Sequence, residues 1–254
     1  MYSPERVQWW LSRTQSRDHQ AAYDAIVSRI SSSARVIIDH CCGNAELLKR
    51  IYQRYIASAN KVNDRKELPL LIGTEITSEM LKLAAENLRA SGIESLFLTD
   101  ATNIMKHRGI VLLEDNFTDS HLPPEISDVS LLTFPELALK IDTPITEEII
   151  SRYNPKSDTE LKVNIANYWL SRVTKRGRQV FVCDYASYAG KGSTLERVYL
   201  RNETELARRF GLSLIAAPFT PSAEIFGDTP DFVQARFKST KDQLGYRILM
   251  YVKT

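Results

Sequence analysis

Apolar and polar positions alternate along this chain with two different periods. Apolar side chains recur at the i, i+3, i+4, i+7 spacing of one helix face in three places, namely from Ala21 to Ile30, after Asn44 and after Thr77, and this spacing predicts amphipathic helices. Between them lie short apolar runs typical of buried strands. The runs that predict strands are 34–39, 68–75, 95–100, 128–134, 178–185, 212–217 and 246–252.

The ends of these elements are predicted from single residues. Asn44 and Thr77 stand where an N-cap is expected, and Gly92 stands where a left-handed residue usually ends a helix. Residues 146–176 are predicted to be largely helical, with one break at Asn154-Pro155. Ala57–Glu67 has the composition of a solvated loop.

One connection is unusually long. Residues 103–127 separate two predicted strands, and the apolar run GIVLLED within them could form a strand or hairpin of its own. At the other end of the chain, 218–245 has no strong helical pattern, which suits an antiparallel pair of final strands.

Strands that alternate with helices predict βαβ units and a mostly parallel sheet. We therefore expect an α/β fold, with a doubly wound, mostly parallel seven-stranded sheet, an antiparallel C-terminal edge pair and helices on both faces. Residues 1–33 are expected to form an N-terminal helical annex or lid, and 34–254 a single domain.

Charge and hydropathy narrow the possible partners. Lys and Arg total 33 against 31 for Asp and Glu, which gives a net charge of +2 and argues against nucleic acid as an obligatory partner. The one basic cluster, Ser171–Gln179, has no interleaved aromatic residues and suits a structural role. No apolar run approaches the roughly 18 residues of a membrane span, and the N-terminus lacks a signal core. A cytoplasmic protein without a membrane partner is expected.

The cysteines predict neither a disulfide framework nor a metal site. There are three, Cys41, Cys42 and Cys183, and two of them are adjacent, which suits small buried thiols in a reducing compartment. His40-Cys41-Cys42 lacks the ligand spacing of a zinc site, so no metal is expected.

Three carboxylates follow three predicted strands. Asp39 ends the first, Glu75 the second and Asp100 the third. In a doubly wound sheet the ligand lies across the carboxyl ends of the strands, and carboxylates facing one crevice need donors or cations. The pattern suits a ligand with an amino group, a ribose diol and an adenine amine. Singly, each acid has a structural alternative, as a helix cap, a solvated strand end or a turn acid.

The segments around these acids resemble the motifs of class I S-adenosylmethionine-dependent methyltransferases, over nearly the whole chain from about Ala22. VIIDHCCGNAELL resembles the first motif, an acid followed by alternating glycines, LIGTEITSEMLKLAAENLRASG the second, and FLTDAT the third. The resemblance implies a Rossmann-like domain, S-adenosyl-L-methionine as cofactor and methyl transfer as the reaction.

The resemblance also implies roles for residues at the methionine end of the cofactor. Asp39 would lie near the ammonium group, and the turn of Cys41, Gly43 and Asn44 would line the amino-acid tail. Tyr23 resembles the tyrosine of a lid over the cofactor, in an N-terminal segment that also holds Trp9 and Trp10. Phe134 lies in the segment that the family uses to face its substrate.

At the nucleoside end, the resemblance implies four contacts. Glu75 would accept both ribose hydroxyls, and Ile76 would pack on the adenine face. Asp100 would accept the adenine amine, while the backbone N–H of Ala101 would meet a ring nitrogen.

The first motif departs from the family pattern. Cys41 and Ala45 stand where the family usually has glycine. Because a Cβ disfavours left-handed backbone by about 1–2 kcal/mol, we expect ordinary φ at Cys41 and the closest approach to the ligand at Gly43 alone. A dinucleotide-binding G-x-G-x-x-G is excluded, since Glu46 is too large for its third glycine.

The acceptor side is less informative. Glu136, Tyr185 and His19 are candidate catalytic residues without an assigned role; Glu136 suits a general base, an amine-binding anion or merely an acid at a helix N-terminus. The Thr133-Phe134-Pro135-Glu136 segment lacks the Asn-Pro-Pro-aromatic motif of many amine methylases.

We expect in-line methyl transfer to a small-molecule acceptor. A methyltransferase-like binding or scaffold protein without catalysis, and an RNA or protein methyltransferase, are the alternatives. The sequence assigns no oligomeric state.

Overall fold

A computed structural model describes residues 4–62, 68–134, 144–187, 194–221 and 244–254. Its helices are α1 (Pro4–Thr14), α2 (Arg17–Arg29), α3 (Glu46–Val62), α4 (Ser78–Ala90), α5 (Pro144–Tyr153), α6 (Asp158–Val173) and α7 (Thr194–Arg208), with short 3₁₀ helices η2 (Ile104–Lys106) and η3 (Phe117–Asp119). Its strands are β1 (Val36–His40), β2 (Leu70–Glu75), β3 (Ser95–Leu98), β4 (Gly109–Glu114), β5 (Ser127–Thr133), β6 (Thr174–Ser187), β7 (Leu212–Ala216), β8 (Phe219–Pro221) and β9 (Leu244–Lys253).

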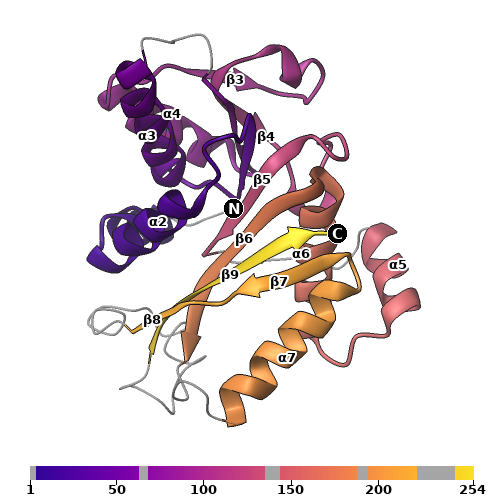
Figure 1. Cartoon of the computed structure of the whole chain (residues 1–254). Coiled ribbons are helices and arrows are strands. Elements are labelled where there is room, and N and C mark those ends of the chain that lie inside the picture. Colours follow the sequence, from indigo (N-terminus) through magenta and orange to yellow (C-terminus); the bar gives the residue numbers. More distant parts are fainter. Residues whose placement is uncertain (1–3, 63–67, 135–143, 188–193, 222–243) are drawn as a thin grey trace.

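The strands form one mixed sheet (Figure 1), with the order β3-β4-β2-β1-β5-β6-β9-β7 and β8 paired with β9. The pairs from β3 to β6 are parallel, and β9 runs antiparallel to β6, β7 and β8. The expected α/β class, the parallel body and the antiparallel C-terminal strands are confirmed. The expected count of seven strands is wrong, because the described residues form nine.

The additional strand β4 changes the order of the sheet. It is the run GIVLLE, and it pairs with β2 on one side and β3 on the other. Val111 and Leu112, which point to opposite faces, are both fully buried, whereas Leu96 and Phe97 of β3 are 42% and 45% exposed. A strand that is apolar on both faces belongs in the interior of a sheet, so β4 takes the inner position and β3 the edge.

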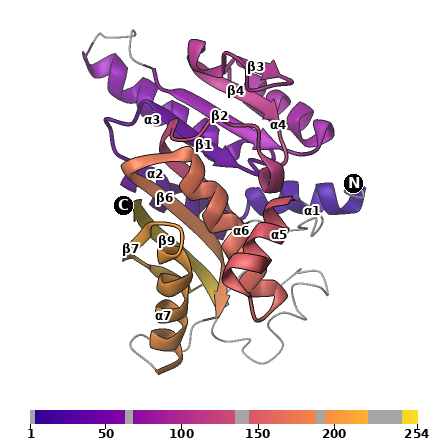
Figure 2. The same ribbon diagram turned by 90° about the vertical axis from the view of Figure 1, so that its right-hand side faces the viewer.

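Helices cover both faces of the sheet (Figures 1 and 2). One buried cluster joins α2, α3 and α4 to one face, and a second joins α5, α6 and α7 to the other face of β5, β6, β7 and β9. A third lies under the segment that contains Ile104, Leu122 and Ile126, on the second face of β1, β2 and β4. The carboxyl ends of β1, β2, β4 and β5 therefore meet at one edge of a covered sheet.

Several predicted boundaries shift. The helix expected after Asn44 begins at Glu46 and runs to Val62, into the predicted loop. Thr77 occupies its expected N-cap position, although its side chain makes no capping hydrogen bond, and Gly92 has the expected left-handed φ of 71°. The break at Asn154-Pro155 separates α5 from α6 as predicted.

The basic cluster has ionic partners within the fold. Lys175 Nζ lies 3.1 Å and Arg178 Nε 3.5 Å from Asp128 Oδ1. The other carboxylate oxygen accepts the N–H groups of Arg35 and Val36. These contacts fasten the N-terminal ends of β1, β5 and β6, which agrees with a structural role. Every helix in the described residues is too short or too polar to span a bilayer.

Candidate cofactor site

The turn that follows β1 contains three left-handed residues at alternate positions. The φ angles of Cys41, Gly43 and Ala45 are 56°, 53° and 58°. The expectation of ordinary φ at Cys41 is therefore wrong, because the turn keeps the backbone of an alternating-glycine loop although only its middle position, Gly43, is a glycine. Cys42 N–H donates to Thr74 O at 2.9 Å and Ala45 N–H to Cys42 O at 2.9 Å, and these bonds hold the strained turn in place.

This strain marks a candidate ligand site. A non-glycine residue in left-handed backbone destabilises the fold by about 1–2 kcal/mol, and such residues gather at functional sites. Alternation of left-handed and ordinary residues turns successive N–H groups into a concavity that receives negative or polar groups. Met80 Cε would lie 3.8 Å from a Cβ at Gly43, which is ordinary van der Waals contact, so the left-handed φ and not a lack of space favours glycine there.

Asp39 is buried beside this turn with an unsatisfied oxygen. Its side chain is 1% exposed, and Oδ1 has no hydrogen-bond partner among the described residues. Burial, and secondly the charge of Glu75, raises the pKa of Asp39 to about 8. A carboxyl group kept in this state is a receptor for a cation, since a positive group would satisfy the oxygen and favour its ionisation.

Glu75 links the turn after β1 with the turn after β2, because its carboxylate meets backbone N–H groups of both. Its Oε1 accepts the N–H of Ile76 at 2.9 Å and that of Thr77 at 3.4 Å, and the N–H of Gly43 also stabilises its charge. Burial raises the pKa of Glu75 in spite of these donors. The next side chain, Ile76, is 50% exposed. A buried acid followed by an exposed apolar side chain offers a ligand a hydrogen-bond acceptor and an apolar contact surface side by side.

The third predicted acid does not join the other two. Because β4 lies between β2 and β3, the strand that Asp100 follows is not a neighbour of the strand that ends in Glu75. Asp100 is exposed, and its Oδ1 accepts Thr102 N–H at 2.6 Å in a local turn. The strand beside β2 on this side is β4. The residue that follows it, Asp115, donates its N–H to Glu75 O at 3.0 Å, at the end of β2.

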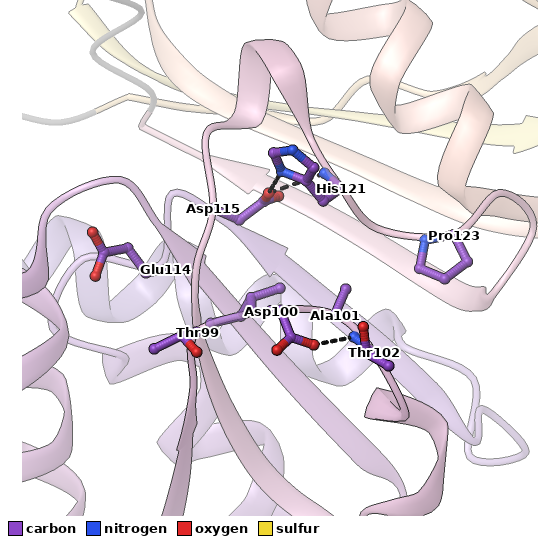
Figure 3. Close-up of a pocket in the computed structure, with 9 residues that line it drawn as sticks. Thr99, Asp100, Ala101, Thr102, Glu114, Asp115, His121 and Pro123 are labelled. Atoms are coloured by element: carbon purple, nitrogen blue, oxygen red, sulfur yellow. Dashed lines mark hydrogen bonds and ion pairs between the residues drawn. The ribbon is translucent and has the colours of Figure 1, made fainter.

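A separate hollow of about 450 Å³ lies at this outer end of the sheet (Figure 3). Asp100 and Ala101 line it together with Glu114, Asp115 and His121. The Asp115 carboxylate accepts Ser120 Oγ–H at 2.5 Å and His121 N–H at 3.0 Å, and it thus closes the loop after β4. The run LEDNFTD, an acid pair directly after an apolar strand, was the sequence signal for this position.

His40 and Thr74 form a second buried polar pair, on the opposite face of β1 and β2 from Asp39. They are register partners, they are 0% and 1% exposed, and neither His40 ring nitrogen nor Thr74 Oγ1 has a hydrogen-bond partner among the described residues. Burial lowers the pKa of His40 to about 3, so its ring is neutral at neutral pH.

Helix α2 covers the carboxyl end of β5. The His19 ring lies 4.0 Å, centroid to centroid, from that of Phe134, and the Tyr23 ring lies 6.3 Å from it. Phe134 follows β5 in a left-handed conformation, with φ 48°. Three residues that the sequence proposed for the site are therefore together. Burial, and then the charge of Arg13, lowers the pKa of His19 to about 3, which makes it a weak proton acceptor.

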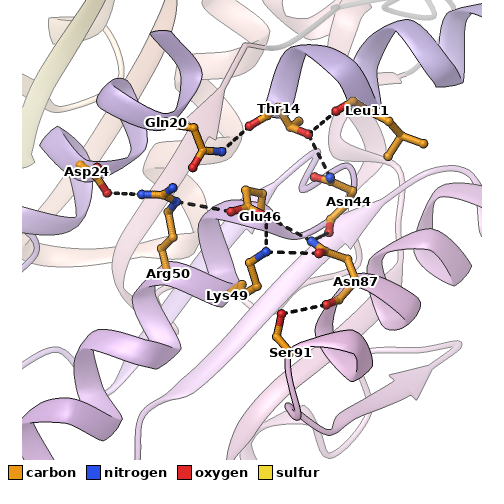
Figure 4. A network of polar contacts seen from close by, with 10 residues as sticks. All are labelled: Leu11, Thr14, Gln20, Asp24, Asn44, Glu46, Lys49, Arg50, Asn87 and Ser91. Atoms are coloured by element: carbon orange, nitrogen blue, oxygen red, sulfur yellow. Dashed lines mark hydrogen bonds and ion pairs between the residues drawn. The ribbon is translucent and has the colours of Figure 1, made fainter. Parts of the chain in front are cut away.

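Helix α1 is joined to the turn by hydrogen bonds (Figure 4). Asn44 Nδ2, in the turn, donates to Thr14 Oγ1 of α1 at 3.0 Å. Gln20, in α2, donates to Thr14 O and so joins α1 to α2. Asn44 therefore binds α1 instead of capping α3, which corrects the predicted N-cap. Asn87 Nδ2 donates to Asn44 O at 2.9 Å, so the same residue also reaches α4.

A wider set of polar contacts supports this junction. The buried Glu46 pairs with Lys49 and Arg50, and Arg50 also contacts Asp24 of α2. The helix that begins at the turn is thus fastened to the N-terminal segment as well as to the sheet.

Arg13, the penultimate residue of α1, is a further candidate that the sequence did not indicate. Its side chain is 8% exposed, and Nε and Nη2 have no hydrogen-bond partner among the described residues. A basic residue in the last turn of a helix is common, so the sequence carried no signal of its burial.

The structure describes only some of the candidate residues on the acceptor side. Glu136 lies outside the described residues, and for Tyr185 the structure describes only a backbone position in β6 opposite Tyr246. Of the three catalytic candidates, His19 alone has described surroundings.

No protein-family model matches this sequence, and no curated protein matches it. Solved structures do match. A geranyl diphosphate methyltransferase in complex with GPP and sinefungin has a TM-score of 0.58 at 10% identity, over 92% of this chain and 79% of that one. The [4+2]-cyclase SpnF gives 0.56 at 14%, over 92% and 80%.

A third similar structure is a putative sarcosine dimethylglycine methyltransferase from Galdieria sulphuraria, with a TM-score of 0.51 at 15% identity, over 93% of this chain and 85% of that one. At such identities the likeness concerns the fold. Over about 92% of its length, the chain has the fold of class I S-adenosylmethionine-dependent methyltransferases.

Proposed function

We propose that the protein binds S-adenosyl-L-methionine and transfers its methyl group to a small-molecule acceptor. The observation that carries the proposal is the strained turn of Cys41, Gly43 and Ala45 beside the buried, unsatisfied Asp39. Strain and an orphaned carboxyl oxygen both destabilise the free protein, and a ligand with a cationic amino-acid tail would account for both.

The residues present fit this cofactor. Asp39 would receive the ammonium group and the turn would line the amino-acid tail. Glu75, whose Oε1 is held by Ile76 N–H, would accept the ribose hydroxyls, and the exposed Ile76 would pack against adenine. Since Asp115 rather than Asp100 adjoins Glu75, we assign the adenine edge to the segment Asp115–Asn116.

The chemistry that the cofactor supplies when bound is an activated methyl group on sulfur. The protein then has to position an acceptor in line and exclude water, because the donor needs no further activation. His19, Tyr23 and Phe134 pack at the carboxyl end of β5 and would form one wall of the reaction site. A covered site of this kind suits a small acceptor rather than an RNA or a protein.

The three free thiols suit the reducing cytoplasm as the compartment of this protein.

A binding protein with the same fold but without methyl transfer is the second candidate. The similar fold of a [4+2]-cyclase illustrates that a fold does not determine the reaction. Retention of the strained turn supports cofactor binding in both cases, so binding is the first property to measure and methyl transfer the second.

The test is calorimetric titration with S-adenosylmethionine and S-adenosylhomocysteine. Glu75→Ala removes hydrogen bonds to the ribose and should weaken binding by about 1.5–3 kcal/mol for each charged bond lost. Glu114→Ala is the matched control, because Glu114 is the register partner of Glu75 on the next strand and is exposed; it should bind like the wild type. Absence of binding to the wild type would refute the proposal.

A further inference from the structure

The side chain of Arg13 is a buried cation, and two of its three guanidinium nitrogens, Nε and Nη2, have no hydrogen-bond partner in the described part of the chain. Favourable interaction with the end of α1 explains a cation at this position, but not its burial. Guanidinium groups are rarely buried unless they are paired, and orphaned donors of a charged group destabilise a fold by a few kcal/mol. The free protein therefore contains an anion-binding group that lacks its anion.

The surroundings of Arg13 place it beside the strained turn. The next residue, Thr14, accepts the Asn44 amide at 3.0 Å, and Asn44 lies between the left-handed Gly43 and Ala45. The Arg13 charge also acts on His19, whose ring lies against Phe134. Arg13 is thus near both the turn after β1 and the aromatic residues at the end of β5.

The acids nearby do not neutralise it. Asp39 and Glu75 both have pKa values raised by burial, and neither forms an ion pair with Arg13 in the described structure. A zwitterionic ligand would resolve both deficits, because its ammonium would satisfy Asp39 and its carboxylate would satisfy Arg13. The methionine end of the proposed cofactor has this pair of charges on one carbon.

We propose that Arg13 binds the carboxylate of the cofactor's methionine moiety and that this contact holds α1 closed over the site. The inference rests on the proposed function, and it adds that α1 is a cover fastened by the ligand itself. Thr14–Asn44 fixes α1 in the free protein, and Arg13 adds an attachment that forms only when a carboxylate is present.

The experiment compares S-adenosylmethionine with its decarboxylated analogue, which keeps the sulfonium, the amine and the nucleoside. The wild type should bind S-adenosylmethionine about ten-fold or more tightly, as expected for a charge-assisted pair. In Arg13→Gln this preference should fall to about one, with the affinity for the decarboxylated analogue unchanged.

Arg29→Gln is the matched control, because Arg29 occupies the last turn of the next helix and is exposed; it should keep the preference. Hydrogen exchange of α1 should slow with S-adenosylmethionine in the wild type, and not with the decarboxylated analogue. In addition, Arg13→Gln should not lower the thermal stability of the free protein, since it removes an unpaired buried cation.

Four outcomes would overturn the inference. Equal affinities of the wild type for both compounds, or a preference that survives in Arg13→Gln, would exclude Arg13 as the carboxylate receptor and leave the proposed function intact. A marked loss of stability in ligand-free Arg13→Gln would mean that Arg13 has a structural partner. Failure of the wild type to bind either compound would refute the proposed function itself.

Discussion

Asp39 and Glu75 point to the same face of the sheet, on neighbouring strands in which Asp39 pairs with Gly73. Burial raises the pKa of Asp39 to about 8, and the charge of Glu75 adds to this effect. Two acids so placed oppose each other's ionisation, and the protein bears this repulsion in the absence of a ligand.

The first prediction concerns stability and pH. The folded-state pKa of Asp39 lies above its unfolded value, so the folded protein binds more protons between about pH 4 and 8 and loses stability as pH rises through this range. Asp39→Asn removes that loss and should stabilise the free protein by about 1–3 kcal/mol at pH 8, with little effect at pH 4. Chemical unfolding at both pH values measures the difference. An equal gain at both would contradict the assigned pKa.

The second prediction concerns proton release. If the cofactor's ammonium ionises Asp39, binding at pH 7 should release up to about one proton, and the affinity should rise with pH until about 8. Titration calorimetry in buffers of different ionisation enthalpy counts the protons. Asp39→Asn should bind weakly and without the Asp39-linked release; unchanged release in this variant would assign the proton to another group.

The third prediction tests the left-handed turn. Ala45 and Ala84 are both fully buried, but Ala45 has φ 58° and Ala84 lies inside α4. Ala45→Gly should be neutral or stabilising by up to about 1 kcal/mol, because relief of strain offsets the lost methyl group. Ala84→Gly should destabilise by about 1 kcal/mol or more. Similar losses in both variants would show that residue 45 is not strained.

The fourth prediction concerns His40. Its folded pKa of about 3 lies below the unfolded value of 6.5, so the wild type should lose stability as pH falls from about 6.5 towards 3, where only the unfolded chain gains the proton. His40→Leu should be more stable by about 1–3 kcal/mol at pH 5, and the difference should widen with acidity. Ile38→Val, on the same face of β1, controls for repacking and should show a loss independent of pH.

Hydrophobic periodicity was sufficient to predict the class of fold and most elements, because each buried strand and amphipathic helix is encoded locally. The position of a strand within the sheet is not. GIVLLE was recognised as a possible strand, but its place between β2 and β3 follows from burial on both faces, and this order is what separates Asp100 from Glu75.

In the candidate site, too, some features could be predicted from local sequence and others depend on tertiary structure. Asp39 and Glu75 could be chosen from sequence because acids at strand ends are visible there. The φ of Cys41 could not, since local sterics favour the opposite conformation and tertiary hydrogen bonds override it. Arg13 could not either, because burial of one ordinary basic residue depends on how α1 packs.

The position of β9 between β6 and β7 has a consequence for biosynthesis. Among the strands that the structure describes, β7 pairs with β9 alone, and β9 comes after both β6 and β7 in the chain. While the ribosome is still translating the segment ahead of β9, the emerged β6 presents an open edge and β7 has no place in the sheet. Unpaired edges of this kind promote association between chains, so a translational pause before residue 244 should be the stage at which this protein depends most on chaperones.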